Sequence, residues 1–228
     1  MMRLDRFLSE AGLASRKELK QIIRSGSVRV DGLVAKNADM KIDENHAEVL
    51  VDGQRIRLKG RTVLLLHKPA GYVTSTEDPR DRTVMELLPE EYRNLFPVGR
   101  LDKETEGLLL FTDDGDLCHR LISPKSGTEK EYLALTEGQP DEEDAAAFRG
   151  GIVLRDGTEC LPAELIPLAG GCRVILHEGK YHQVRRMLAS RGKPVKYLRR
   201  IREGSLTIEG LERGEYRLLT EKEINEML

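Results

Sequence analysis

Residues 97–111 read PVGRLDKETEGLLLF, a polar loop between two glycines that leads into an uninterrupted apolar strand. Polar loops held by a rigid scaffold carry function more often than the core does. This loop contains Asp102, together with Arg100 and Thr105. A loop aspartate is more often a turn or capping residue than a catalytic one. Residue type and spacing alone therefore favour the turn interpretation of Asp102.

The region around this loop, residues 62–228, alternates strand and helix signals. The predicted strands are 63–67, 108–112, 130–136, 152–154, 158–166, 173–177, 195–201 and 206–208, and the predicted helices are 83–88, 117–122, 141–149, 181–190 and 220–227. Strands predominate, and tight turns such as Asp156-Gly157 join several neighbours. The pattern predicts an α+β domain with a mainly antiparallel, mixed sheet.

Residues 1–58 form a small separate module in this interpretation. Apolar residues at Leu4, Phe7 and Leu8 have helical spacing, and Ser15-Arg16-Lys17-Glu18 is a capping box that begins a second helix. Asp31-Gly32 and Asp52-Gly53 then mark hairpin turns. The order is helix, helix and hairpin, followed by a linker at 59–61 and the larger domain at 62–228.

Composition excludes several classes of protein. The chain has 228 residues, of which 33% are charged, and its apolar runs are far shorter than the ~18 residues of a membrane span. The N-terminus lacks the apolar core of a signal peptide. Three scattered cysteines make a disulfide framework and a zinc site improbable and fit a reducing cytoplasm. We therefore expect a cytoplasmic protein with no membrane partner.

Charge is unevenly distributed although the net charge is only −2. Residues 180–202 carry nine Lys and Arg and no Asp or Glu, and residues 1–30 carry seven basic and three acidic residues. The first stretch favours binding to a polyanion. For the N-terminal stretch a solvated helix face is an equally good explanation.

Common cofactor and hydrolase motifs are missing from the sequence. There is no phosphate-binding P-loop, no dinucleotide-binding glycine motif and no G-x-S-x-G elbow. His177 and His182 are better explained as polar strand and helix residues than as metal ligands. Residues 113–116 resemble a cation loop but fit a turn and helix cap better. We expect neither a cofactor nor a metal.

Four segments in this order resemble the pseudouridine synthases, and specifically their RsuA branch, which modifies ribosomal RNA. Along the chain they are HKPAGYVTS (67–75), GRLDKETEGLLL (99–110), EKEY (129–132) and EGKYHQVRRM (178–187). Residues 3–32 resemble the RNA-binding module named after a small-subunit ribosomal protein, S4. The resemblance covers nearly the whole chain and implies an isomerase that converts a specific uridine to pseudouridine.

The resemblance also implies roles for individual residues. Asp102 matches the catalytic aspartate, a nucleophile or base whose target on sugar or base is disputed. Arg185 matches the basic partner that would hold this carboxylate ionised, with Arg186 as the alternative. Tyr132 matches the tyrosine that stacks on the target base and helps to move the carbon 5 proton.

The target uridine must leave its RNA helix or loop, and basic residues would offset the cost of flipping it. The residues expected to contact RNA are Arg100, Lys130, Arg186, Lys68, Arg16, Lys17, Lys20 and Arg24. The N-terminal sequence favours 16S ribosomal RNA, free or in a precursor particle, with a monomeric enzyme. The alternatives are a 23S site, a non-catalytic ribosome-assembly factor that binds RNA, and a hydrolase that uses Asp102 as its base.

Overall fold

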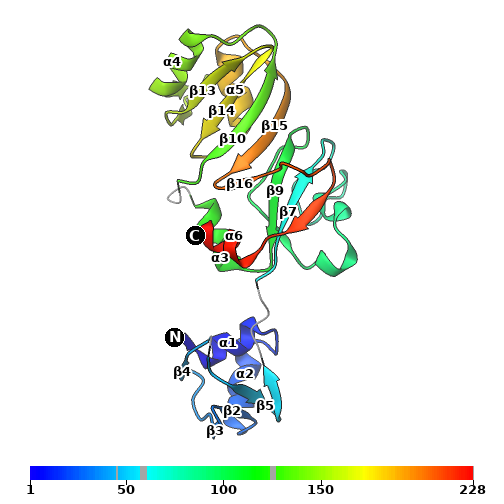
Figure 1. Cartoon of the computed structure of the whole chain (residues 1–228), viewed down its shortest axis with the longest axis vertical. Helices are drawn as coiled ribbons and strands as arrows, with labels where there is room; N and C mark the ends of the chain where they lie inside the picture. Colours follow the sequence, from blue (N-terminus) through cyan, green and yellow to red (C-terminus); the bar gives the residue numbers. More distant parts are fainter. Residues whose placement is uncertain (45, 57–60, 124–126, 228) are drawn as a thin grey trace. The chain divides into compact units, whose positions relative to one another are not determined.

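The computed structural model describes residues 1–44, 46–56, 61–123 and 127–227, without the side chain of Arg16. Its contacts divide the chain into two compact units, Met1–Gly60 and Arg61–Leu228 (Figure 1). Of the linker expected at 59–61, residues 59 and 60 lie outside the described residues. Each unit is considered by itself below.

The N-terminal unit begins with two short helices, α1 (Leu4–Glu10) and α2 (Arg16–Arg24). The capping box predicted at Ser15 is present, because its hydroxyl accepts a hydrogen bond from the Glu18 backbone N–H and the Glu18 carboxylate accepts one from the Ser15 N–H. Apolar residues of both helices pack with the following strands into one small core. The predicted start of the second helix at Ser15 is therefore confirmed.

Short antiparallel strands complete this unit. They are β1 (Met2–Arg3), β2 (Val28–Val30), β3 (Leu33–Val34), β4 (Lys41–Ile42), β5 (Val49–Val51) and β6 (Gln54–Ile56). The four-stranded sheet has the order β3-β2-β5-β6. Asp31 and Asp52 adopt left-handed backbone conformations, each followed by a glycine with positive φ, as two-residue hairpin turns require.

The second unit is built on a nine-stranded sheet. Its strands are β7 (Val63–Lys68), β8 (Phe96–Val98), β9 (Glu106–Thr112), β10 (Lys130–Thr136), β13 (Glu164–Leu168), β14 (Gly171–Leu176), β15 (Val195–Glu203), β16 (Leu206–Thr207) and β17 (Tyr216–Leu218). The main order is β13-β14-β10-β15-β9-β7-β17, and only the β15–β9 pair among these described strands is parallel. The mixed, mainly antiparallel sheet is therefore confirmed.

Helices cover different faces of the two halves of this sheet. Helix α4 (Glu142–Gly150) and helix α5 (Gln183–Ser190) contribute apolar residues to the core that also contains Tyr132. Helices α3 (Gly115–Ile122) and α6 (Glu221–Glu226) pack in a second core with alternate residues of β7 and β9. Because both faces of β7 and β9 are covered, residues 63–66 and 108–111 of these strands are all apolar.

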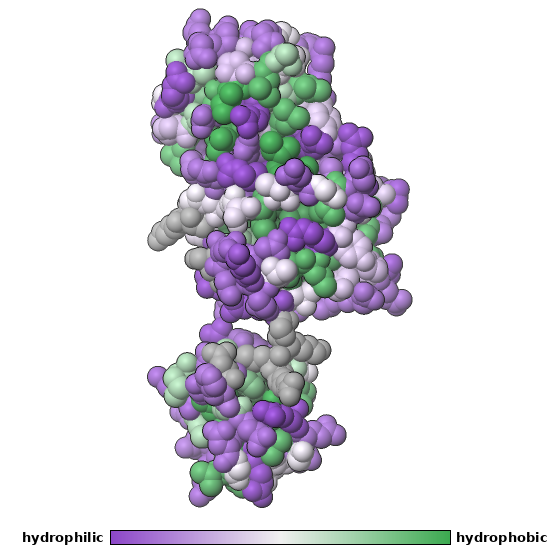
Figure 2. Space-filling view, in the orientation of Figure 1, coloured by the Kyte–Doolittle hydropathy of each residue, from purple (hydrophilic) through white to green (hydrophobic). Residues whose placement is uncertain are grey.

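The face of β10, β14 and β15 opposite Tyr132 is less covered. Leu135 on β10 and Leu168 on β13 are 43% and 37% exposed. Figure 2, in the orientation of Figure 1, shows hydrophobic and hydrophilic residues intermixed over the part of the molecule that holds these strands. Tyr132 therefore faces the packed, helix-covered side of the sheet.

Some predicted elements differ in the structure. The segment predicted as a helix at 83–88 forms a 3-10 helix, Val84–Leu87, and the strand predicted at 158–166 splits into β12 (Glu159–Cys160) and β13 because Pro162 interrupts it. Strand β12 pairs with β11 (Ile152–Val153), and a second 3-10 helix spans Glu90–Tyr92. Strands β8 and β17 were not predicted, because three residues carry too little periodicity.

No helix within the described part of the chain is long and apolar enough to span a membrane.

Candidate active site

The loop before β9 is held in place by a buried lysine. The Lys68 side chain is 0% exposed, and its ammonium donates to the backbone carbonyls of Pro69, Asp102, Lys103 and Thr105 at 2.8–3.2 Å. Burial lowers the pKa of Lys68 to about 8. The expected contact of Lys68 with RNA is therefore wrong: its charge is used inside the protein to fix the backbone of the Asp102 loop.

A hydroxyl fixes the other end of the same loop. The Thr74 hydroxyl donates to the Leu101 carbonyl at 2.7 Å and accepts from the Leu101 N–H at 3.1 Å. The Thr105 N–H closes a turn on the Asp102 carbonyl at 3.0 Å. With Lys68, these bonds specify the loop backbone on both sides of Asp102, so the carboxylate is presented from a rigid support.

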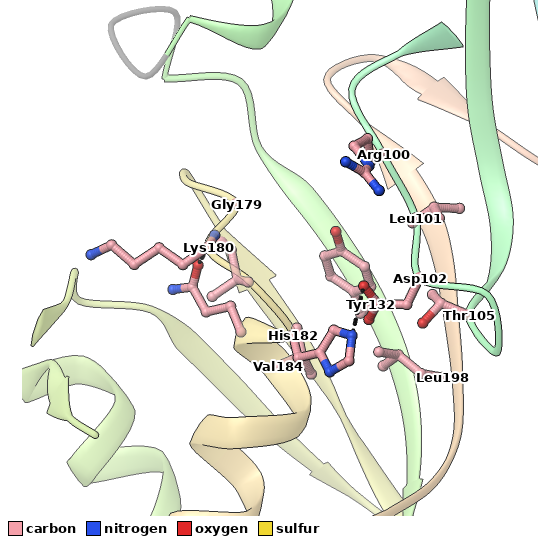
Figure 3. A pocket seen from close by; sticks show the side chains of 12 residues that line it. Arg100, Leu101, Asp102, Thr105, Tyr132, Gly179, Lys180, His182, Val184 and Leu198 are labelled. Carbon is pink, nitrogen blue, oxygen red and sulfur yellow. Dashed lines mark hydrogen bonds and ion pairs between the residues drawn. The ribbon is translucent and has the colours of Figure 1, made fainter. Parts of the chain in front are cut away.

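Asp102, Tyr132 and His182 converge from three separate elements (Figure 3). Asp102 lies in the loop before β9, Tyr132 lies on β10, and His182 is the residue that immediately precedes α5. The Asp102 carboxylate lies 3.4 Å from His182 Nε2, and both side chains are about one-third exposed. Tyr132 is 9% exposed, and burial raises the pKa of its phenol.

Two adjoining cavities lie at this point. The smaller, about 80 Å³, is lined by all three of these side chains, and the larger, about 440 Å³, shares Tyr132 and Arg100 with it. A ring at the edge of both cavities can stack on a planar base, and an exposed carboxylate can reach the sugar or base atoms beside it. The arrangement fits a nucleoside whose base has left its stack.

Arg185 contacts the Asp102 loop at the backbone carbonyl of Glu104. Its guanidinium donates to the Glu104 carbonyl at 3.3 Å and to the Val195 carbonyl at 3.5 Å. Arg186 pairs with Asp156 at 2.5 Å. In this structure the recorded ionic contact of the Asp102 carboxylate is with His182, while Arg185 supports the loop two residues further on.

Arg100 and Lys130 both lie at the cavities. Arg100 is exposed and lines both of them. Lys130 is only 16% exposed, lies 3.8 Å from Glu203, and its pKa is lowered by burial. Arg100 can therefore reach an RNA phosphate directly, whereas Lys130 contributes charge from the cavity wall.

The basic stretch 180–202 does not form a continuous positive surface. Seven of its nine cations pair with acidic residues: Lys180 with Glu178, Arg186 with Asp156, Arg191 with Glu143 and Asp144, Lys193 with Asp144, Lys196 with Glu137, Arg200 with Glu203, and Arg202 with Glu129 and Glu131. Tertiary contacts therefore compensate most of the charge of this stretch, and its binding to a polyanion stays a prediction.

The basic helix of the N-terminal unit remains open to solvent. Lys17, Lys20 and Arg24 are exposed on α2, while Leu19 and Ile23 on its other face are buried. The side chain of Arg16 lies outside the described residues. The three described cations form one exposed helix face that can follow a phosphate backbone.

Sequence reasoning missed two residues of this site. His182 was set aside as an ordinary helix residue, and Arg200 was counted only among the nine basic residues. The backbone of His182 is left-handed, with φ of 48°, which is uncommon for a non-glycine residue and marks functional sites more often than others. Its place within the quoted KYHQVRR segment was the available signal.

Across the described residues, no group of three or more His, Cys, Asp and Glu side chains could hold a metal ion. The cysteines are unpaired, and Cys160 and Cys172 are buried.

Comparison with known proteins gives consistent results for both units. Residues 62–190 match the RNA pseudouridylate synthase family, and residues 2–48 match the S4 domain. A ribosomal small subunit pseudouridine synthase A from Vibrio cholerae is 44% identical, with 98% of each chain covered. An uncharacterised RNA pseudouridine synthase from Bacillus subtilis is 41% identical, covering 98% of this chain and 97% of its own.

A solved structure of a pseudouridylate synthase superposes on the whole chain. Its TM-score is 0.71 at 34% sequence identity, and 100% of both chains is covered.

Proposed function

The chain belongs to the RNA pseudouridylate synthase family, and from this premise we propose that it isomerises a specific uridine of 16S ribosomal RNA, with Asp102 as the catalytic carboxylate. Members of this family are isomerases that act on RNA, and this protein is therefore an isomerase that acts on RNA. The observation that carries the assignment is the convergence of Asp102 and Tyr132 on one cavity, from a loop fixed by Lys68.

The reaction breaks the bond between N1 of uracil and C1′ of ribose, turns the base, and joins C5 to C1′. Asp102 would act as the nucleophile or base, and its one-third exposure leaves the carboxylate accessible to a flipped nucleotide. Tyr132 would stack on the base. Arg185 would support the Asp102 loop, and Arg100 would contact the neighbouring phosphate.

Several relatives support the choice of 16S RNA. Those from Vibrio cholerae and Salmonella typhimurium are named ribosomal small subunit pseudouridine synthase A and match at 44% and 42% identity over nearly the whole chain. We propose that residues 1–58 bind the RNA through Lys17, Lys20 and Arg24, and that the enzyme works as a cytoplasmic monomer on free RNA or a precursor particle.

The test is primer extension across 16S and 23S RNA after treatment with a carbodiimide that marks pseudouridine. Wild-type protein should produce one new stop in 16S RNA, and Asp102→Asn, which keeps the side-chain shape, should produce none. A stop in 23S RNA would move the target to the large subunit. Release of free uracil would indicate a hydrolase, and RNA binding without a stop on transcripts or assembly intermediates would indicate a non-catalytic assembly factor.

A further inference from the structure

A buried arginine lies directly beside Tyr132. Strands β10 and β15 pair Tyr132 opposite Arg200, and both residues line the larger cavity. Arg200 is 2% exposed, and its Nε donates to the Leu108 carbonyl at 2.8 Å. This hydrogen bond orients the guanidinium, so that its charge lies at a fixed place next to the phenol.

The ion pair of Arg200 is incompletely satisfied. Its Nη2 lies 3.3 Å from Glu203 Oε2, yet neither atom makes a hydrogen bond to a described residue, although both are buried. Lys130 lies 3.8 Å from the other oxygen of Glu203. A buried charge without full hydrogen bonding is costly, and two cations here share one carboxylate.

The charges facing Tyr132 leave an excess of positive charge on its sheet side. On the sheet itself, β15 contributes Arg200 and Glu203, and β10 contributes Lys130. The loop before β9 contributes Asp102 and Arg100, and the segment before α5 contributes His182. Asp102 has its own contact with His182, and Lys180 at the cavity rim pairs with Glu178 at 3.0 Å. Burial raises the pKa of the Tyr132 phenol, Glu203 and Asp102 act in the same direction, and Arg200 opposes them, so its charge is the influence that favours a negative phenolic oxygen.

The backbone at Arg200 is fixed by its neighbour in the parallel strand. Gly107 has a φ of +113°, and a Cβ added there would lie 2.1 Å from the Arg200 carbonyl oxygen. The glycine therefore permits the close approach of β9 and β15 at this residue. The same loop-to-strand junction presents Asp102 and sets the position of Arg200.

We propose that Arg200 is a positioning residue that keeps positive charge against Tyr132, so that the phenolic oxygen can accept the C5 proton in the last step of the isomerisation. This inference rests on the proposed function. The C5–H bond breaks and its electron pair forms the C5–C6 double bond, while the electrons of the C6–N1 double bond move to N1, which takes a proton from water. The Tyr132 phenolate takes the C5 proton and returns it to water, so that no proton is gained or lost overall.

The test follows tritium release from RNA that carries tritium at C5 of the target uridine, between pH 6 and 10. In Arg200→Met the release at pH 7.5 should fall at least ~10-fold, the acidic limb of the profile should move up by about one pH unit, and deuterium at C5 should slow the reaction more than in wild type. In Glu203→Gln the limb should move to lower pH, because an opposing negative charge is removed.

Two further variants control for structural damage. Arg199→Met changes the adjacent residue of β15, which faces the other side of the sheet, and should leave the profile unchanged. Arg200→Lys keeps the charge and should recover part of the rate at the wild-type pH limb. If Arg200→Met unfolds, the opposite shift in Glu203→Gln still tests the inference.

Equal losses at every pH in Arg200→Met and Glu203→Gln, with an unchanged isotope effect, would overturn the inference and leave the proposed function standing. A wild-type protein that makes no pseudouridine in any ribosomal RNA would overturn the proposed function first.

Discussion

The carboxylate of Asp102 lies 3.4 Å from Nε2 of His182, although the two residues are 80 positions apart in the sequence. The His182 ring stacks on Tyr181, with ring centroids 3.9 Å apart, and its backbone is left-handed. The contact joins the Asp102 loop to the start of α5, so that the carboxylate is oriented by two elements.

Replacing His182 should reduce activity more than stability. Asparagine tolerates the left-handed backbone, so His182→Asn should keep the melting temperature within about 2 °C while lowering kcat/KM by roughly tenfold, through loss of the carboxylate contact. His182→Ala should also destabilise the fold by about 1 kcal/mol. Single-turnover assays and thermal unfolding of both variants give the comparison, and full activity in His182→Asn would show that the contact is dispensable.

Removing the Lys68 ammonium should loosen the Asp102 loop. In Lys68→Met four carbonyls lose a donor, so kcat should fall at least ~10-fold and the loop amides should exchange faster with deuterium. Lys103→Met is the matched control, since Lys103 is on the same loop but pairs with Asp81 at the surface. Equal exchange rates in wild type and Lys68→Met would contradict the assignment.

The pH dependence of Lys68 has opposite signs for stability and activity. The pKa of Lys68 is about 8 in the folded protein against 10.5 for an ordinary lysine, so between these values the unfolded chain binds a proton that the folded chain does not. Stability of wild type relative to Lys68→Met should therefore rise across pH 8–10.5, with a maximum slope of about 1.4 kcal/mol per pH unit. Activity should fall over the same pH range, because a neutral amine donates fewer hydrogen bonds to the loop carbonyls than the ammonium does. Denaturant unfolding and initial rates at matched pH check both signs.

Adding one methyl group at Gly107 should disrupt the junction of β9 and β15. The new Cβ would lie 2.1 Å from the Arg200 carbonyl oxygen, and the alanine would be held at a positive φ. We therefore expect the free energy of unfolding to fall by roughly 3 kcal/mol or more. Gly115→Ala is the control, because nothing lies within 4 Å of its Cβ and α3 favours alanine. Wild-type melting of Gly107→Ala would contradict the close approach.

The exposed face of α2 should contribute to RNA affinity through charge. The triple variant Lys17→Ala, Lys20→Ala and Arg24→Ala should weaken binding and reduce the slope of log K against log salt by up to ~2.7, if each residue contacts one phosphate. Arg149→Ala, an exposed arginine on α4, should leave the slope unchanged. An unaltered slope in the triple variant would remove this helix from the RNA interface.

Local patterns were sufficient to predict most of the fold. The capping box at Ser15, the Asp-Gly turns and the period of the apolar residues identify the N-terminal helices and hairpins, because each depends on neighbours within a few residues. Strands β8 and β17 escaped prediction because they are defined by pairing with distant strands: Val98 with Leu110 and Tyr216 with Leu66. Asp102 and Tyr132 are predicted as site residues by resemblance to a family, since spacing alone favours a turn residue and a core residue.

By itself the sequence determined the two-part organisation, the element types and the loop that carries Asp102, since these follow from short-range periodicity and motif order. Only the tertiary structure decided the use of the charges. Lys68 was expected to contact RNA, but its buried ammonium supports the Asp102 loop. In the middle of the basic stretch, Arg191, Lys193 and Lys196 form ion pairs with Glu143, Asp144 and Glu137. The physical reason is that burial and ion pairing depend on contacts between residues far apart in the sequence, and local sequence patterns do not specify those contacts.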